Sequence, residues 1–299
     1  MVQSTSSRST VSPFAVADTT LAVETRCPQG RPTLLFAHGF GQTRGAWNAA
    51  ADALADAGCR CVTFDSRGHG ESGRVHDGDY RIDQFALDLL RLAAVQAEPP
   101  ILVGASMGGL LGLVLAGEIR PAPFRALVLV DITPRWEAAG VERILAFMQA
   151  HPEGFASYAE AAEQVAAYLP QRRERKTEDQ LRPLLREEAD GRLRWHWDPA
   201  LLAGDLVQES ERYQPRLLAA ASNIDIPVLL LSGARSDVVS RATVEEFLQR
   251  VPHAQHVELP HATHMVVGDA NDVFAHEVTR FVQSLDSPAD RQRAGAVQP

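Results

Sequence analysis

The chain has 299 residues, of which 45% are hydrophobic, and it carries a formal net charge of −9. This length suits one large domain with an insertion, and the acidic balance argues against nucleic acid and membrane surfaces as partners, because phosphate-binding proteins normally carry a basic field. The start of the chain is too polar for a secretory signal, and its three cysteines lack metal-ligand spacing. We therefore expect a cytoplasmic protein, monomeric or homodimeric, that binds a small molecule.

Strands alternate with helices along most of the chain, because short apolar runs predict strands and one-faced apolar spacing predicts helices. In chain order we expect a hairpin at 14–16 and 21–25, a strand at 33–37, a helix at 46–57, a strand at 60–64, a helix at 82–96, a strand at 101–105, a helix at 107–118, strands at 126–130 and 228–232, a helix at 241–251, a strand at 255–259 and a helix at 272–284. This order is typical of an α/β protein with a mostly parallel, doubly wound sheet.

Residues 133–222 interrupt the alternation. They show helical patterns only, at 138–150, 157–168, 177–188 and 208–221, which predicts an inserted all-helical cap. The α/β core then comprises residues 1–132 and 223–285. We expect residues 1–13 to be disordered and residues 286–299 to form a flexible tail.

One hydroxyl interrupts the apolar stretch 101–115. It belongs to Ser106, in the sequence G-A-S-M-G at the junction of an expected strand and an expected helix. A sharp strand-to-helix turn strains its central residue and leaves no room for large neighbours, which explains Gly104 and Gly108. The pattern G-x-S-x-G is typical of a nucleophile elbow, although a serine that caps the helix is the alternative.

Acid and base candidates follow other strands of the expected sheet. In open parallel sheets, functional residues collect at the carboxyl ends of the strands. Asp237 follows the strand at 228–232 and His264 follows the strand at 255–259, so both are expected at the same edge as Ser106. A serine needs a histidine to take its proton, and the histidine needs an acid to orient it.

These motifs together resemble the α/β-hydrolase fold superfamily over about residues 14–285. They are H-G-F at 38–40, D-S-R-G-H-G-E-S at 65–72, G-A-S-M-G-G at 104–109, L-S-G-x-x-S-D-V-V at 231–239, and H-M at 264–265 followed by G-D-x-N-D. The resemblance implies an esterase- or lactonase-like enzyme with a serine nucleophile and a helical cap, without metal or organic cofactor. It also implies an oxyanion hole formed by the backbone N–H groups of Phe40 and Met107.

Two aspartates compete for the place beside His264. Asp131 ends the strand at 126–130, where some α/β-hydrolases carry the acid, and Asp237 follows the next strand of the sheet in the more usual position. We favour Asp237, because the loop 233–237 has the reach to bring a carboxylate beside the imidazole. Asp131 is followed at once by Ile132-Thr133-Pro134, so we expect it to support the start of the cap through local hydrogen bonds.

Aromatic residues of the cap offer an apolar surface above Ser106. Tryptophans flank His196 on both sides, and they either pack the interior of the cap or line a substrate pocket. For His261, a position at the pocket edge and a position on the protein surface are equally favoured. The expected substrate-binding residues are Phe40, Trp136, Phe147, Trp195 and Trp197.

The sequence thus predicts a serine hydrolase that cleaves a small, mostly apolar carboxylic ester or lactone through an acyl-enzyme formed by Ser106, His264 and Asp237. One alternative is hydrolysis of a C–C bond in a vinylogous diketone by the same triad. Another is a ligand receptor that uses the same pocket without turnover. Fold-level resemblance alone does not decide among these substrates.

Overall fold

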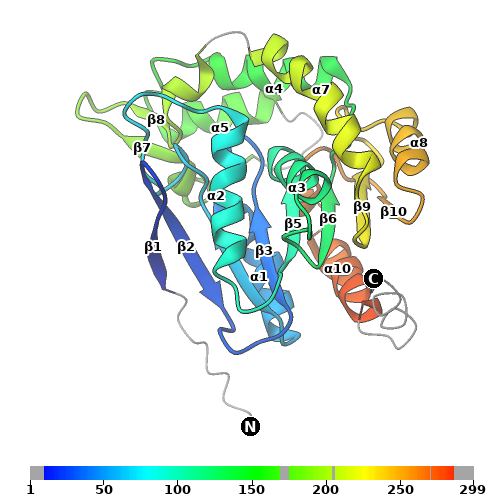
Figure 1. Cartoon of the computed structure of the whole chain (residues 1–299). Coiled ribbons are helices and arrows are strands. Elements are labelled where there is room, and N and C mark those ends of the chain that lie inside the picture. Colours follow the sequence, from blue (N-terminus) through cyan, green and yellow to red (C-terminus); the bar gives the residue numbers. More distant parts are fainter. Residues whose placement is uncertain (1–9, 169–174, 204–205, 270, 286–299) are drawn as a thin grey trace.

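The computed structural model describes residues 10–168, 175–203, 206–269 and 271–285 (Figure 1). Within these residues, one sheet has the strand order β1-β2-β4-β3-β5-β6-β9-β10. Its strands are β1 Val11–Ala15, β2 Thr20–Arg26, β3 Thr33–Ala37, β4 Arg60–Phe64, β5 Ile101–Ala105, β6 Ala126–Val130, β9 Val228–Gly233 and β10 Gln255–Leu259. β1 and β2 are antiparallel to their neighbours and the other strands are parallel, which confirms the mostly parallel sheet.

Helices cover both faces of the sheet, because the central strands are apolar on both sides. In β3, Leu34 and Phe36 belong to one hydrophobic core and Leu35 and Ala37 to the other. The first core packs against α1 Asn48–Asp56 and α10 Asn271–Ser284, and the second against α2 Ile82–Ala94, α3 Met107–Glu118, α7 Leu206–Ser222 and α8 Arg241–Arg250. The doubly wound arrangement is therefore confirmed.

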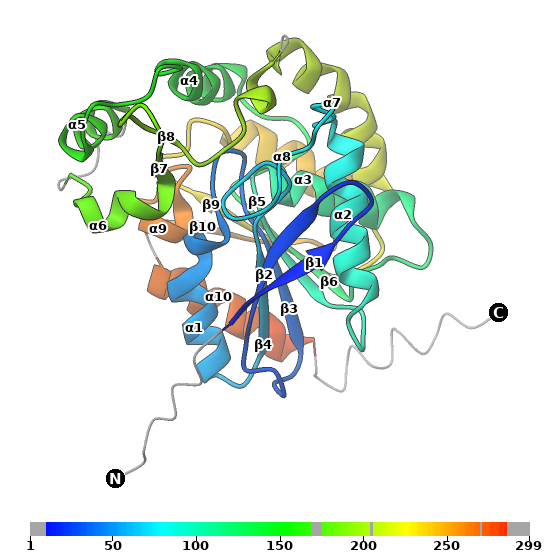
Figure 2. The same cartoon turned by 90° about the vertical axis from the view of Figure 1, so that its left-hand side faces the viewer.

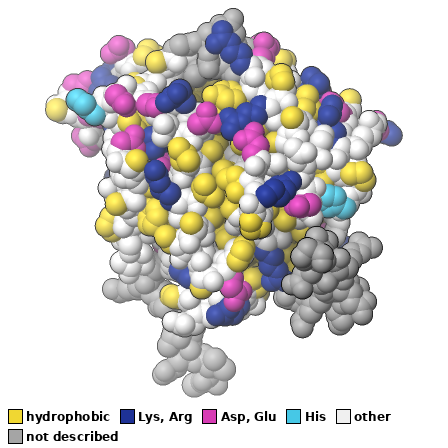
Figure 3. All heavy atoms as spheres, viewed as in Figure 1, with side chains coloured by type: hydrophobic (Ala, Val, Ile, Leu, Met, Phe, Trp, Pro, Cys, Tyr) yellow, Lys and Arg dark blue, Asp and Glu magenta, His cyan; other side chains and the backbone are white. Residues whose placement is uncertain are grey.

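The face that α2 and α3 present in Figure 1 carries apolar side chains over its middle, with Lys, Arg, Asp and Glu among them (Figure 3). Leu87 of α2 and Val95 just after it are among the exposed apolar residues. Among the described residues, no helix is both long enough and apolar enough to cross a bilayer.

Residues 133–222, which we call the cap, come between β6 and β9. They contain α4 Ala138–Gln149, α5 Tyr158–Tyr168, α6 Glu178–Leu181, two 3₁₀ turns at Arg182–Leu184 and Pro199–Leu202, strands β7 Leu185–Glu187 and β8 Leu193–Trp195, and α7. Figures 1 and 2 show α4, α5, β7 and β8 together on one side of the molecule, beyond the sheet. The last helix, α7, packs along α3 instead.

The expectation of an all-helical cap is wrong at one place. The helix expected at 177–188 ends after one turn, and β7 pairs with β8 in an antiparallel hairpin. Pro183 explains the break, because proline inside a helix removes a hydrogen bond and clashes with the preceding turn. Asp190-Gly191 marks the hairpin turn, with Gly191 at a φ of 78°, and this dipeptide is a hairpin signal that the sequence offered.

The expectations for the chain ends fall partly outside the described residues. The proposed tail, residues 286–299, lies wholly outside them, as do residues 1–9 of the start. Residues 11–13, expected to be disordered, belong to β1, which pairs with β2 from Val11 to Ala15. The proline at position 13 is tolerated there because β1 is an edge strand.

Candidate active site

Ser106 lies at the sharp turn between β5 and α3, as expected. Its φ is 47°, a left-handed conformation that is unusual for a residue with a side chain. Its backbone N–H donates to the carbonyl of Val130 at 3.1 Å, which ties the turn to the end of β6. A Cβ built on Gly108 would lie 2.2 Å from the carbonyl oxygen of Ala37, so only glycine allows α3 to start so close to β3. The geometry is that of a strained elbow carrying a nucleophile.

His264 is paired with Asp131. The Nδ1 atom of His264 lies 2.7 Å from Oδ2 of Asp131, whose side chain is only 1% exposed. Because a carboxylate is the acceptor, Nδ1 carries the proton in this bond and Nε2 keeps its lone pair. The imidazole is therefore held in the tautomer that a general base requires.

The carboxylate of Asp131 accepts two further hydrogen bonds, one from the last residue of β9 and one from the loop that follows it. The N–H of Gly233 donates to Oδ1 at 2.7 Å, and the hydroxyl of Ser236 donates to Oδ2 at 2.5 Å. Asp131 itself has a φ of 48°, and its N–H donates to the carbonyl of Leu231. Three donors thus satisfy a buried carboxylate, which would otherwise be costly to keep charged.

Asp237, the expected partner of His264, has a different partner, and that expectation is wrong. Its Oδ2 accepts from Nε of Arg143 on α4 at 2.7 Å, and its side chain is 35% exposed. The preceding residue, Ser236, is the one that points inward, so the next side chain along the loop points outward. Sequence reasoning missed Ser236, although a hydroxyl next to the favoured aspartate stood in the quoted motif.

The loop 38–42 lies against the nucleophile. A Cβ built on Gly39 would be 3.3 Å from the Cβ of Ser106. Within the described residues, no acceptor is found for the N–H of Phe40 or for that of Met107, whereas the N–H of Gly41 donates to His69. Both unused amides are the ones that the family resemblance implies for the oxyanion hole, whose role here remains a prediction.

No hydrogen bond in the described residues joins Ser106 to His264, but their loops are linked. The side chain of Gln42 accepts from the N–H of Gly39 at 3.3 Å and donates to the sulfur of Met265 at 3.4 Å. Gln42 therefore bridges the loop beside Ser106 and the residue after His264. Contacts between a nucleophile and its base often tighten only when substrate binds.

Two buried histidines support the loop 38–42. Nδ1 of His38 donates to the carbonyl of Gly39 at 2.8 Å, and its Nε2 accepts from the N–H of Ser66. Nε2 of His69 accepts from Gly41 at 3.1 Å, while its Nδ1 donates to the carbonyl of Arg67. Burial lowers the pKa of both rings, because it disfavours the charged form, so both are neutral. These contacts give both rings a structural role.

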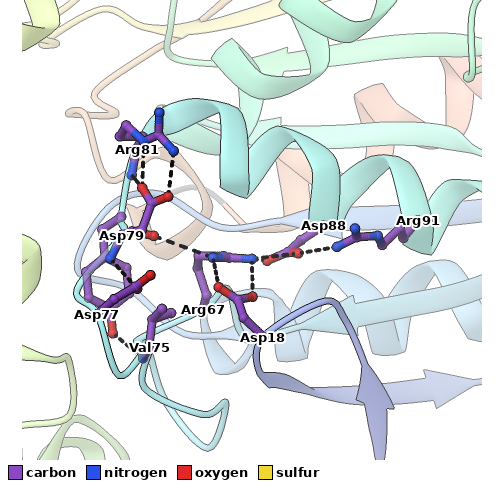
Figure 4. A network of polar contacts seen from close by, with 9 residues as sticks. Asp18, Arg67, Val75, Asp77, Asp79, Arg81, Asp88 and Arg91 are labelled. Carbon is purple, nitrogen blue, oxygen red and sulfur yellow. Dashed lines mark hydrogen bonds and ion pairs between the residues drawn. The ribbon is translucent and has the colours of Figure 1, made fainter.

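A buried ion network fixes the turn that carries His69 (Figure 4). The guanidinium of Arg67 is fully buried and donates to both carboxylate oxygens of Asp88 at 2.7 and 3.0 Å. It also donates to both oxygens of Asp18, at 3.1 and 3.0 Å. The planar fork of arginine suits two carboxylates at once, so this turn is held rigidly.

A cavity of about 270 Å³ opens beside His264. Two cationic side chains, Arg143 and Arg235, and one carboxylate, Asp237, line this cavity. Arg143 is neutralised by Asp237, and its guanidinium also stacks 4.8 Å from the ring centre of Tyr168. Arg235 is exposed, and within the described residues its side chain contacts no carboxylate, only Nδ1 of His261 at 3.4 Å. The other residues lining the cavity are Thr263 and Met265.

Three of the five aromatic residues expected to bind substrate, Phe147, Trp195 and Trp197, pack against one another within the cap. Trp195 and Trp197 lie 4.8 Å apart at 13°, and Phe147 lies 4.1 Å from Tyr168. Trp197 and Met148 both contact the position where Gly41 would carry a Cβ. All three expected tryptophans, Trp136 included, are buried in the larger hydrophobic core, and Phe40 packs against it. A role of these side chains in substrate binding remains a prediction.

No group of three or more His, Cys, Asp or Glu residues in the described part of the chain is arranged to hold a metal ion. The cysteines at 27, 59 and 61 are free thiols, and burial raises the pKa of Cys59.

Comparison with known proteins agrees with the fold. A family model described as "alpha/beta hydrolase fold" matches residues 32–270. The chain is 31% identical over 250 residues to the 3-hydroxybutyrate-oligomer hydrolase of Cupriavidus necator, covering 79% of this chain and 84% of that protein. It is 24% identical over 270 residues to 3-oxoadipate enol-lactonase 1 of Acinetobacter baylyi, covering 89% and 94%. The solved structure of E-2-(acetamidomethylene)succinate hydrolase superposes with a TM-score of 0.78 at 24% identity, over 92% of this chain and 99% of that one.

Proposed function

The chain belongs to the α/β-hydrolase fold family, and from this membership and its site we propose that it is a serine hydrolase that cleaves a small carboxylic ester or lactone through an acyl-enzyme. The observation that carries the proposal is the hydrogen bond from His264 to the buried Asp131, beside the strained elbow of Ser106. A 3-hydroxybutyrate-oligomer hydrolase and a 3-oxoadipate enol-lactonase among the similar proteins support this reaction class.

Each group has a defined task in this reaction. The oxygen of Ser106 attacks the carbonyl carbon while Nε2 of His264 takes its proton, and Asp131 stabilises the imidazolium that forms. The N–H groups of Phe40 and Met107 donate to the oxyanion. His264 then gives its proton to the leaving oxygen, which departs and leaves the acyl-enzyme. Water, deprotonated by His264, releases the acid in the same way.

The substrate that fits the cavity has a short apolar chain and a carboxylate. The cavity beside His264 has two cationic side chains and one carboxylate, and Arg235 is the cation without a carboxylate partner among the described residues. A substrate carboxylate would supply that partner through a charge-assisted hydrogen bond. The named substrates of two similar proteins, 3-hydroxybutyrate oligomers and an enol-lactone of 3-oxoadipate, are acids as well. This refines the expectation of a mostly apolar substrate.

The reaction is tested by replacing the nucleophile. We expect Ser106→Ala to lower kcat on p-nitrophenyl esters by at least about 10³-fold, because the covalent path is lost while the pocket stays. A fluorophosphonate probe should label the unchanged protein at Ser106 and leave the variant unlabelled. Ser222→Ala, on the exposed side of α7, serves as the control and should keep full activity. Hydrolysis that continues in Ser106→Ala would contradict the acyl-enzyme.

The substrate class is tested with two esters of equal chain length. The p-nitrophenyl ester of glutaric acid keeps a free carboxylate, and that of pentanoic acid is neutral. We expect Arg235→Gln to lower kcat/KM for the glutarate ester by roughly tenfold or more, since a hydrogen bond to a charged group is worth about 1.5–3 kcal/mol. The pentanoate ester should change little. Arg241→Gln, which removes one exposed charge from α8, is the matched control. Equal losses on both esters would contradict carboxylate recognition.

A further inference from the structure

A histidine of the cap completes the support of the loop that carries Phe40. His196 follows β8, and its ring is buried, with 2% of the residue exposed. Its Nδ1 accepts from the N–H of Gly70 at 2.8 Å, and its Nε2 lies 3.2 Å from the carbonyl oxygen of Gly41. Sequence reasoning treated this residue only as the centre of the Trp-His-Trp stretch.

The two contacts fix the protonation of His196. The N–H of Gly70 is a donor, so Nδ1 must be unprotonated, and the carbonyl of Gly41 is an acceptor, so Nε2 must carry the proton. Burial lowers the pKa of His196 to about 3, because the charged form loses its hydration. The ring is therefore neutral at pH 7 and makes both bonds at once.

The backbone on both sides of Phe40 is then held from three directions. The carbonyl of Gly39 is bound by His38, the N–H of Gly41 by His69, and the carbonyl of Gly41 by His196. Of the backbone N–H groups of residues 39–42, that of Phe40 is the one for which no acceptor is found among the described residues. Gly41 adopts a φ of 74°, so its orientation depends on these outside contacts.

His196 differs from the other two histidines because it belongs to the cap. The segment around it is docked on the core turn 65–72. The N–H of Asp198 donates to the carbonyl of Gly68 at 2.8 Å, and the hydroxyl of Tyr80 donates to the carboxylate of Asp198 at 2.7 Å. Met148 and Trp197 of the cap also lie within 4 Å of the position that a Cβ on Gly41 would occupy. A change in the position of the cap would therefore move the loop 38–42, because His196 belongs to the cap and contacts Gly41.

We propose that His196 is a positioning residue that aligns the N–H of Phe40 with Ser106, so that the oxyanion hole is complete only while the cap is docked on the core. This inference rests on the proposed acyl-transfer function, because it assigns the Phe40 amide to the oxyanion. It goes beyond that function by assigning the assembly of the hole to a side chain of the cap. Errors in the position of an oxyanion donor act on the transition state more than on substrate binding.

Two substitutions separate the two bonds of His196. In His196→Asn the side-chain oxygen reaches the position of Nδ1, so the bond from Gly70 can persist and the bond to Gly41 is lost. In His196→Gln the side-chain NH₂ reaches the position of Nε2, so the bond to Gly41 can persist and that from Gly70 is lost. A purely structural anchor of the cap would respond to the loss of either bond, whereas the positioning role depends on Gly41.

We expect His196→Asn to lower kcat by about 10- to 100-fold with KM changed less than about threefold, which is below the loss for removing an oxyanion donor outright. The affinity for a trifluoromethyl ketone analogue of the substrate, whose oxyanion occupies the hole, should fall by the same factor as kcat. His196→Gln should retain kcat and analogue affinity within about threefold of the unchanged protein. Thermal unfolding measured by circular dichroism shows that both variants are folded.

Equal losses in the two variants, or no loss in either, would overturn the proposal. So would a loss confined to KM, because that pattern indicates a pocket wall. If His196→Asn does not fold, a folded His196→Gln with a hundredfold lower kcat overturns the proposal, and one with retained kcat supports it. Failure of acyl transfer itself is recognised separately, because Ser106 would then not be labelled by the fluorophosphonate in the unchanged protein.

Discussion

The turn after β6 and the loop after β9 each present an aspartate at the edge of the sheet where Ser106 lies, but the two carboxylates have opposite surroundings. Asp131 is 1% exposed and accepts from Gly233, Ser236 and His264. Asp237 is 35% exposed and pairs with Arg143. The comparison shows that the acid of the site is selected by the donors that surround it, and proximity to the histidine in the chain is a poor guide.

The end of β9 and the loop after it supply hydrogen-bond donors to Asp131, in the turn after β6. The N–H of Gly233, the last residue of β9, and the hydroxyl of Ser236 in the loop both donate to Asp131. The hydroxyl oxygen in turn accepts from the N–H groups of Val238 and Val239 at 3.1 and 3.0 Å. These bonds turn Ser236 inward, and Asp237 is consequently directed toward α4. One loop thus supports the buried acid and supplies a charged side chain to the cavity.

The largest expected effect comes from exchanging each carboxylate for an amide. Asp131→Asn should lower kcat by about 10⁴-fold, because the amide favours the wrong tautomer of His264. Asp237→Asn should leave kcat on the neutral pentanoate ester nearly unchanged. Steady-state kinetics of both variants, with unfolding curves to confirm their folding, make the measurement. A mild loss in Asp131→Asn with a severe one in Asp237→Asn would reverse the assignment.

A smaller effect is expected from the hydroxyl that supports Asp131. Ser236→Ala removes one of three donors to the buried carboxylate, and hydrogen bonds to charged groups contribute about 1.5–3 kcal/mol. We expect the free energy of unfolding to fall by about that amount and kcat to fall by roughly tenfold, since Asp131 and His264 keep their own bond. Ser236→Thr keeps a hydroxyl and provides the control. Unchanged kinetics and stability in Ser236→Ala would show that the loop does not support the acid.

Much of the core was predictable because its signals are local. Gly104 and Gly108 beside Ser106 indicated the elbow, and apolar runs indicated the strands that bring it to the same sheet edge as His264. The choice of acid was not local. It depends on the left-handed backbone of Asp131 and on donors about a hundred residues away in the chain.

In the cap, too, local sequence signals predicted some elements but not the contacts between distant residues. Its helices at 138–149 and 158–168 follow apolar periodicity and were predicted. Strand β7 was read as the end of a helix and strand β8 was not predicted, because each has only three residues. The contact of His196 with Gly41 joins residues 155 apart in the chain. A single sequence contains no pattern that specifies such a contact, because neither residue type nor spacing changes with its partner.

The smallest expected effect is that of Asp237→Asn on stability and on the KM for the charged ester. The ion pair of Asp237 with Arg143 is partly exposed to solvent, and such pairs contribute about 0–1 kcal/mol, so Asp237→Asn should change the free energy of unfolding by less than about 1 kcal/mol. The same substitution removes the negative charge of the cavity and leaves Arg143 and Arg235 unopposed. KM for the glutarate ester should therefore fall, by up to roughly fivefold for a gain of about 1 kcal/mol, while KM for the pentanoate ester stays the same. Added salt should reduce the difference between the two esters, because it screens exposed charges. A rise in KM for the glutarate ester would mean that Asp237 holds Arg143 in the position that binds substrate. Both aspartates would then support the site, Asp131 by orienting His264 and Asp237 by orienting a side chain of the cavity wall.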